Sequence, residues 1–185
     1  METESEISTM NFVPNPMVPE QYLVQRVRRE THDTFTLELS PQSKTDGFRF
    51  SPGQFNMLYV FGVGEVPISI SGDPTKQKSL VHTTRAVGTV TKAMYKLKRG
   101  NVLGVRGPYG TQWPIGNAVG NDVIIVAGGI GLAPLRPAIY QLLSQREKFG
   151  KIVILYGTRT PADILFRKEL EQCRAIHRQW RTRRG

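Results

Sequence analysis

Three glycines, Gly128, Gly129 and Gly131, stand between an apolar run at 123–127 and a segment of helical periodicity. Glycine lets a strand reverse sharply into a helix and leaves the backbone N–H groups uncovered. Such N–H groups, at the positive end of a helix dipole, bind phosphate. A tight structural turn is the alternative, because a glycine cluster alone is a weak signal. The strand before the glycines and the helix after them favour a nucleotide-binding turn.

A polar and a basic residue, Thr158 and Arg159, follow the next apolar run at 151–156. Strand, helix and strand form a β-α-β unit, in which ligands lie at the carboxyl ends of the parallel strands. We therefore predict that both residues contact the nucleotide. A guanidinium group matches phosphate oxygens in bidentate fashion, so we predict that Arg159 pairs with a ribose 2′-phosphate of the nucleotide. A solvated loop arginine is the alternative.

Residues that could support other chemistry are few. His32, His82 and His177 are too dispersed for a metal site, and no Ser-His-Asp or paired-carboxylate arrangement can be recognised. We interpret His82 as a hydrogen-bonded residue of the β-domain and Trp113 as packing at the domain joint. The single cysteine, Cys173, excludes an internal disulfide framework and a metal site made of cysteines alone.

The first half of the chain shows short strands separated by turn signals, which predicts an antiparallel β-barrel or sandwich. The expected strands cover 21–29, 34–40, 54–61, 66–71, 80–87 and 102–106. One helix is expected at 91–98, with Thr91 as its N-cap and Gly100 as the residue after its C-cap.

After a Gly/Pro-rich connector at 107–120, the pattern changes to strand, helix and strand. Apolar residues at 132, 135, 139, 142 and 143 fall on one face of the expected helix. Pro134 and Pro137 are expected in its first turn, where backbone N–H groups lack partners within the helix. The predicted organisation is an extended lead-in (1–20), a β-barrel domain (21–110), an incomplete α/β lobe (121–172) and a basic tail (173–185).

The net charge of +10 would ordinarily raise nucleic acid as a partner. Five of the arginines lie within the last 13 residues, which contain no acid, so half of the net charge belongs to the tail. We therefore expect no nucleic-acid function of the folded body. No apolar window reaches the ~20 residues of a membrane span, and the acidic start differs from a secretory signal. A soluble, cytoplasmic protein is expected.

Six phrases, in this order, resemble the ferredoxin–NADP reductase superfamily, which couples a flavin-binding β-barrel to a nicotinamide lobe. They are Ser-Pro-Gly-Gln-Phe at 51–55, Gly-Val-Gly-Glu-Val-Pro-Ile-Ser-Ile-Ser at 62–71, Arg-Ala-Val-Gly-Thr-Val-Thr at 85–91, Gly-Pro-Tyr-Gly at 107–110, Gly-Gly-Ile-Gly-Leu-Ala-Pro at 128–134 and Tyr-Gly-Thr-Arg at 156–159. Each phrase is modest alone, but six in sequence over about residues 20–172 are specific. The chain is most similar to gamma (diaphorase) subunits of NAD(P)-linked nickel–iron hydrogenases and sulfhydrogenases.

The resemblance implies FAD on the barrel and NAD(P) on the lobe, and it implies a role for each matching residue. Ser69 would lie near the reactive N5 edge of the flavin, as the catalytic position. The flavin would be bound by Pro67, Ile68, Ser69, Thr83, Thr84 and Arg85, its pyrophosphate by Gly88, Val90 and Thr91, and the nicotinamide nucleotide by Gly128, Gly129, Gly131, Leu132, Ala133 and Pro134. No resident metal is implied.

The chain departs from the family in three ways. Many relatives place an arginine where this chain has Val66, which leaves Arg85 or Lys92 as substitutes at the pyrophosphate. The family's lobe continues with further strands, before which this sequence ends. Several relatives also end in four cysteines that bind an iron–sulfur cluster, whereas this sequence has one cysteine. The stretch 173–185 shows neither a strand nor a convincing amphipathic pattern. We hypothesise a truncated or frameshifted end, which translation of the downstream nucleotide sequence in the other frames would test.

The function that the resemblance implies is electron transfer from NAD(P)H, through FAD, to the iron–sulfur clusters of a partner subunit. A nickel–iron hydrogenase is the expected complex. Electron-transfer subunits of dihydroorotate dehydrogenase and anaerobic sulfite reductase are the alternatives within this class. From other classes, a non-catalytic flavin-binding fragment and a basic nucleic-acid-binding protein remain open.

Overall fold

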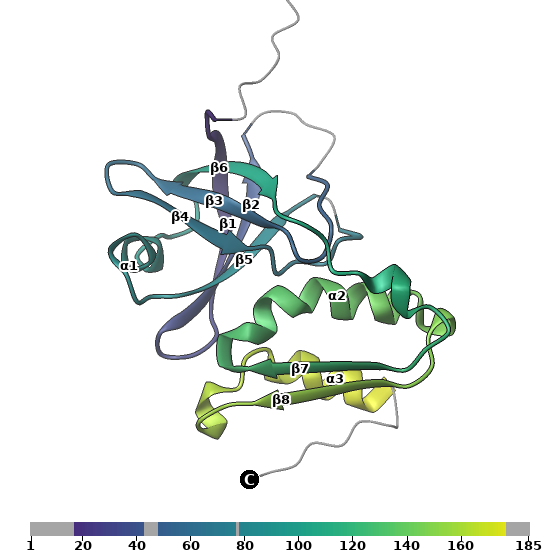
Figure 1. Ribbon diagram of the computed structural model, residues 1–185. Helices are drawn as coiled ribbons and strands as arrows, with labels where there is room; N and C mark the ends of the chain where they lie inside the picture. The colour runs from purple at the N-terminus through teal and green to yellow at the C-terminus, as the bar shows by residue number, and fades with distance from the viewer. Residues whose placement is uncertain (1–16, 43–47, 77, 177–185) are drawn as a thin grey trace, which may run out of the picture.

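A computed structural model describes residues 17–42, 48–76 and 78–176, with side chains through 172. Two parts are visible in Figure 1: a β-barrel made by the first half of the chain, and a smaller α/β lobe below it. This order confirms the predicted fold class.

The barrel contains six antiparallel strands in the order β4-β3-β6-β1-β2-β5. Their bounds are β1 (Glu20–Arg29), β2 (Thr34–Pro41), β3 (Phe55–Val60), β4 (Gly64–Ser69), β5 (Leu80–Arg85) and β6 (Val102–Tyr109). The terminal strands β4 and β5 meet at a bridge between Ile70 and His82, which closes the barrel. All six predicted strands are present, with ends shifted by up to three residues.

Apolar side chains at alternate positions of the strands fill the barrel. On β2, for example, Phe35, Leu37 and Leu39 are fully buried, whereas Thr36 and Glu38 point to the outside. The barrel core contains Tyr22, Val24, Phe35, Leu37, Leu39, Leu58, Val60, Ile70, Leu80, Met94, Leu103 and Val105. Burial of a large aliphatic side chain contributes about 1.5–3 kcal/mol, so this cluster is the main source of barrel stability.

Helix α1 (Thr89–Tyr95) crosses between β5 and β6 and begins earlier than predicted. Gly88 is the N-cap, because the Thr91 side chain reaches back and accepts the Gly88 N–H at 2.9 Å. The prediction of Thr91 as the N-cap is therefore wrong: a threonine three residues into the helix satisfies the same donor. The predicted role of Gly100 is also wrong, since the C-cap is Lys96 and Gly100 lies in the turn before β6.

The lobe contains two parallel strands, β7 (Val123–Gly128) and β8 (Ile152–Gly157), joined by α2 (Leu132–Ser144) and followed by α3 (Arg167–Ile176). Short 3-10 turns lie at Ile115–Ala118, Gly129–Gly131, Arg146–Lys148 and Pro161–Asp163. Leu132, Ile139 and Leu142 are buried on one face of α2, as the periodicity predicts. Pro137, however, lies inside α2 rather than in its first turn, because the helix already begins at Leu132 and Pro137 is its sixth residue.

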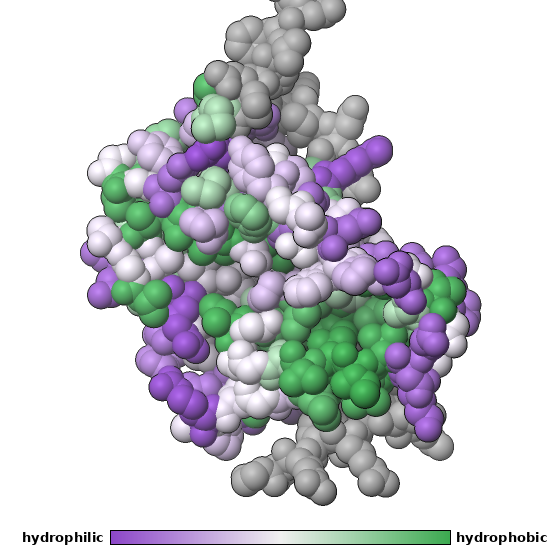
Figure 2. All heavy atoms as spheres, viewed as in Figure 1, coloured by the Kyte–Doolittle hydropathy of each residue, from purple (hydrophilic) through white to green (hydrophobic). Residues whose placement is uncertain are grey.

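Both helices cover the same face of the two-stranded sheet, against Ile125, Ala127, Ile152 and Ile154. The opposite face is apolar and exposed. Figure 2 shows it as the large hydrophobic patch over β7 and β8. It is formed by Ile124, Val126, Val153 and Leu155, which are 38–69% exposed.

The predicted basic tail begins within α3, which continues to Ile176. Residues 177–185 and most of the predicted lead-in (1–16) lie outside the described part of the chain.

Candidate functional site

The carboxyl ends of the two lobe strands are both glycine and lie side by side. Gly128 of β7 pairs with Gly157 of β8 in the parallel register. A Cβ built at Gly128, Gly129, Gly131 or Gly157 would meet no protein atom within 4 Å. The space over this edge is therefore open to a ligand. Gly129 has a φ of +51°, a conformation that side chains disfavour, so the turn itself requires glycine there.

The turn leads directly into α2, whose N-cap is Gly131. No side chain caps this end of the helix. Leu132 and Ala133 point into the lobe core, and Pro134 is half-buried. These three residues can offer a ligand their backbone and the helix dipole, whereas their side chains anchor the helix.

Tyr156, which the sequence analysis did not single out, holds the turn from behind. Its hydroxyl donates to the Gly129 carbonyl at 3.0 Å and accepts the Leu165 N–H at 3.3 Å. The hydroxyl is protonated at neutral pH, and burial raises its pKa further above the ordinary 10.0. The available sequence signal was an aromatic residue with a polar tip at the end of a buried strand.

Beyond β8, Arg159 is exposed and lies in the bend that follows Gly157. The neighbouring Thr158 hydroxyl donates to the Thr160 carbonyl at 2.9 Å and stabilises the bend. Thr160 and Asp163 cap the next turn reciprocally. Arg159 is thus placed at the carboxyl edge of the sheet, where the β-α-β interpretation predicts it.

On the barrel, the outer face of β4 presents Pro67 and Ser69. Pro67 is exposed and Ser69 half-buried, while Ile68 points inward and packs against the barrel core. Only the backbone of Ile68 can therefore face a flavin. Ser69 and Ser71 lie on one side, as the alternation predicts, and Ser71 is fully buried.

His82 supports β4 from inside the barrel. Its Nδ1 donates to the Ser69 carbonyl at 3.0 Å, and its Nε2 accepts from the Asn56 amide at 3.1 Å. This pattern assigns the proton to Nδ1. Complete burial is the main cause that lowers the pKa of His82 to about 4. The prediction of a hydrogen-bonded barrel histidine is confirmed.

The predicted flavin residues of β5 alternate between two environments. Thr83 faces outward, and its hydroxyl lies 2.9 Å from those of Thr36 and Ser71. Thr84 faces the core, with no hydrogen-bond partner for its Oγ1. Arg85 faces outward again.

Arg85 lies 3.3 Å from the Asp33 carboxylate, measured from its Nε. The contact lacks hydrogen-bond geometry, so this buried Nε is left without a hydrogen-bond partner. Burial raises the pKa of Asp33, but hydrogen bonds from Thr34 and Thr31 and the charge of Arg85 outweigh it and lower the pKa. Arg85 is thus paired with Asp33 through a buried Nε, while its side chain as a whole is 32% exposed.

The corner at 87–91 is internally satisfied. The Thr91 hydroxyl accepts the N–H groups of both Val87 and Gly88, at 3.1 and 2.9 Å, and donates to the Gly88 carbonyl. Val90 packs against the barrel core. Of the predicted pyrophosphate donors, the Gly88 N–H is thus tied to Thr91, whereas Lys92 is exposed beside it.

Trp113 lies where the connector leaves the barrel. Its backbone N–H donates to the Pro52 carbonyl at 2.8 Å, and its ring lies against Gly53, although the residue is 45% exposed. Among residues 17–42, 48–76 and 78–176, no group of three or more His, Cys, Asp or Glu side chains could hold a metal ion. Within the same residues, no helix is long and apolar enough to cross a membrane.

Comparison with known proteins finds relatives for both parts. The family model described as the oxidoreductase NAD-binding domain matches residues 125–184. The sulfhydrogenase 2 subunit gamma of Pyrococcus furiosus is 38% identical over 74% of this chain and 46% of its own length. A probable dihydroorotate dehydrogenase B (NAD(+)) electron transfer subunit of Methanocella arvoryzae is 36% identical over 74% of this chain and 46% of its own.

Among solved structures, ferredoxin-NADP+ reductase from Plasmodium falciparum superposes with a TM-score of 0.72 at 17% identity. The match covers 88% of this chain and 68% of that one. The chain spans about half the length of the curated relatives it matches. The barrel, the connector and the lobe with its two glycine strand ends therefore have the fold of ferredoxin-NADP+ reductase, and the second half of the chain matches the oxidoreductase NAD-binding domain.

Proposed function

We propose that this chain is the FAD- and NAD(P)-binding part of an electron-transfer subunit. The observation that carries the proposal is the pair of glycine strand ends, Gly128 and Gly157, which leave an open edge in front of an uncapped helix. Such an edge fits the phosphates of a nicotinamide nucleotide. The similarity to sulfhydrogenase gamma and to dihydroorotate dehydrogenase electron transfer subunits supports the same function.

The outer face of β4 and β5 fits FAD. Pro67 and Ser69 would lie along the isoalloxazine, with Ser69 at its reactive edge, and Arg85 would bind the pyrophosphate. Arg85 is favoured over Lys92 because it ends β5, directly after the proposed flavin-binding residues Thr83 and Thr84. FAD, when bound, supplies the redox chemistry: it takes a hydride from NAD(P)H and releases the two electrons singly.

The chain's own residues bind and orient the two cofactors. The Gly128–Gly131 turn would hold the nucleotide phosphates, and Arg159 would pair with the 2′-phosphate of NADP(H). His82 and Tyr156 would keep the β4 strand and the glycine turn in place through their backbone hydrogen bonds.

The acceptor we propose is the iron–sulfur clusters of a partner subunit, in a nickel–iron hydrogenase of the cytoplasm. A dihydroorotate dehydrogenase complex is the second candidate, since similarity to its electron transfer subunit is of the same order. Co-purification of the native complex, followed by assays for hydrogen uptake and dihydroorotate oxidation, distinguishes the two.

The cofactor assignment is tested by reconstituting the full chain with FAD and recording its visible spectrum under anaerobic conditions. We expect one bound FAD and its bleaching by NADPH faster than by NADH, with the preference lost in Arg159→Ala. We expect slow multiple turnover, because the apolar sheet face is uncovered. Absence of FAD binding would refute the proposal. If nucleic-acid affinity were the function, it would disappear when residues 173–185 are deleted.

A further inference from the structure

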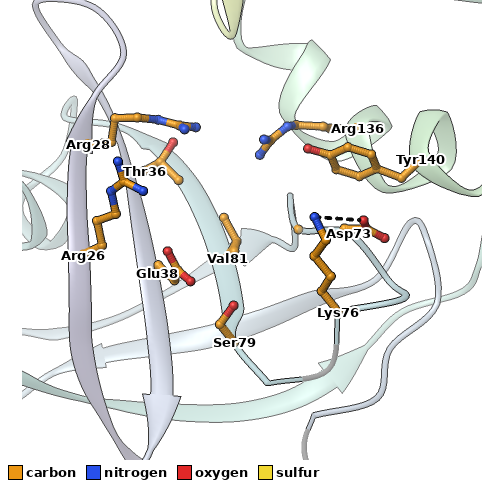
Figure 3. A pocket seen from close by; sticks show the side chains of 11 residues that line it. Arg26, Arg28, Thr36, Glu38, Asp73, Lys76, Ser79, Val81, Arg136 and Tyr140 are labelled. Carbon is orange, nitrogen blue, oxygen red and sulfur yellow. Dashed lines mark ion pairs between the residues drawn. The ribbon is translucent and has the colours of Figure 1, made fainter. Parts of the chain in front are cut away.

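Arg136 lies at the joint between the two parts, on the barrel side of α2. It is only 8% exposed, although it is charged. Figure 3 shows Arg136 and Tyr140 extending from the helix towards Arg28 and Thr36 of the barrel. A buried guanidinium requires compensation from partners, so its contacts indicate what the joint depends on.

The three nitrogens of the guanidinium donate to two different segments of the chain. Nη1 donates to the Ser71 carbonyl, just after β4, at 3.0 Å. Nε and Nη2 donate to the Glu169 carboxylate of α3, at 3.0 and 2.6 Å. The guanidinium also lies 4.2 Å from the centre of the Phe166 ring. Burial opposes the charge of Arg136, but Glu169 outweighs it and raises the pKa.

From Ser71 a chain of hydroxyl groups continues along the outer face of the barrel strands. The Ser71 hydroxyl lies 2.9 Å from that of Thr83, which lies 2.9 Å from that of Thr36. The Thr36 hydroxyl in turn donates to Glu30 at 2.6 Å. Buried polar networks of this kind fix one geometry, because each member loses a partner if the others move.

Packing alone does not fix the joint here. A cavity of about 170 Å³ lies beside Arg136, lined on the barrel side by Arg26, Arg28, Thr36, Glu38 and Val81. The two parts are therefore not in close apolar contact along this stretch. The angle of α2 to the barrel depends correspondingly more on the guanidinium.

The contact connects the two places where the cofactors are assigned. Ser71 is two residues beyond Ser69, and Arg136 lies in α2 five residues after its N-cap Gly131. We propose that Arg136 is a positioning residue for hydride transfer, which sets the glycine turn at the distance from β4 that nicotinamide and flavin require. This inference rests on the function proposed above.

The rate of hydride transfer is the sensitive measure of such positioning. The reacting atoms must approach to about 3–3.5 Å, and a misplacement of about 1 Å can lower this rate about 100-fold. Lysine at 136 keeps the charge but cannot donate to Ser71 and Glu169 in one plane. We therefore expect Arg136→Lys to slow single-turnover reduction of bound FAD by NADPH by roughly 10- to 100-fold. FAD affinity should stay at the wild-type value, and the long-wavelength charge-transfer absorption of the nicotinamide–flavin pair should weaken.

The matched control is Arg146→Lys. Arg146 also donates to a backbone carbonyl, that of Phe149 at 2.7 Å, but both residues lie within the lobe. Glu169→Gln, which removes the negative charge that pairs with the guanidinium, should also slow the reduction of FAD, as Arg136→Lys does. All rates are measured on full-length chains shown to be folded by circular dichroism, so that loss of stability is not mistaken for loss of positioning.

The outcomes separate the two proposals. Reduction of Arg136→Lys at the wild-type rate with an undiminished charge-transfer band would overturn the positioning role alone. An equal slowing in Arg146→Lys would overturn it as well, because the effect would then not depend on the joint. A wild-type chain that binds no FAD would instead overturn the proposed function, and the positioning role with it.

Discussion

The pH dependence of stability should be governed by His82 between about pH 6.5 and 4. Burial lowers the pKa of His82 from its ordinary 6.5 to about 4 in the folded chain. Between these values the unfolded chain binds the proton and the folded chain does not, so stability falls as the pH falls. The contribution is fully present above pH 6.5, since the histidine is then neutral in both states.

The expected loss follows from the width of that window. Each pH unit between the two pKa values is equivalent to about 1.4 kcal/mol, which gives ~3 kcal/mol over the whole window. A domain of this kind has a total stability of about 5–15 kcal/mol, so the loss is measurable by urea unfolding. Asp33, whose pKa is lowered from 3.8, loses most of its contribution at a lower pH than the histidine does.

The matched variant is His82→Gln, which keeps a donor and an acceptor on a side chain of similar length. It should be less stable at pH 7, because its geometry towards Ser69 and Asn56 is imperfect. Its stability should nevertheless change little between pH 6.5 and 4. Equal pH dependence of the wild type and His82→Gln would refute the reasoning, since the proton would then bind elsewhere.

Three further predictions concern the lobe. Tyr156→Phe should cost about 1–2 kcal/mol of stability and weaken NADPH binding, because the Gly129 carbonyl loses its donor; unchanged NADPH affinity by calorimetry would contradict this. Gly128→Ala should fold normally, because φ is −123° and its Cβ meets open space, yet bind NADPH more weakly; wild-type affinity would exclude a phosphate at this edge. Val126→Lys, at a 69% exposed site, should change stability by less than about 0.5 kcal/mol, whereas Ile125→Ala should cost about 2–5 kcal/mol by urea unfolding; equal losses would mean that both faces of the sheet are covered.

The strand pattern of the barrel was predictable because turn residues and period-2 alternation are local signals. The glycine turn was predictable for the same reason, from the change of periodicity at 123–143. The start of α1 was not, since Thr91 satisfies the Gly88 N–H from inside the helix rather than from its cap. A threonine at the N-cap and a threonine three residues into the helix can each hydrogen-bond a backbone N–H of the first turn, and only the backbone conformation distinguishes the two positions.

Contacts between distant segments could not be read from the sequence. Arg136 lies among apolar residues of α2, and no local pattern indicates that it contacts Ser71 and Glu169. The outward and inward positions of Thr83 and Thr84 depend on the register with β2, which places Thr36 opposite Thr83. A run of two threonines does not reveal which of them lies on the cofactor side.

One principle links the three residues that support the candidate site. His82 donates to the Ser69 carbonyl, Arg136 to the Ser71 carbonyl and Tyr156 to the Gly129 carbonyl. Each carbonyl lies at or just beyond a strand end, where the regular hydrogen bonding of a sheet runs out. A buried carbonyl without a partner is costly, and long polar side chains from neighbouring elements supply the missing donors. The same donors hold the backbone still beneath the face that is left open to ligands, which is the rigidity that two cofactors in contact require.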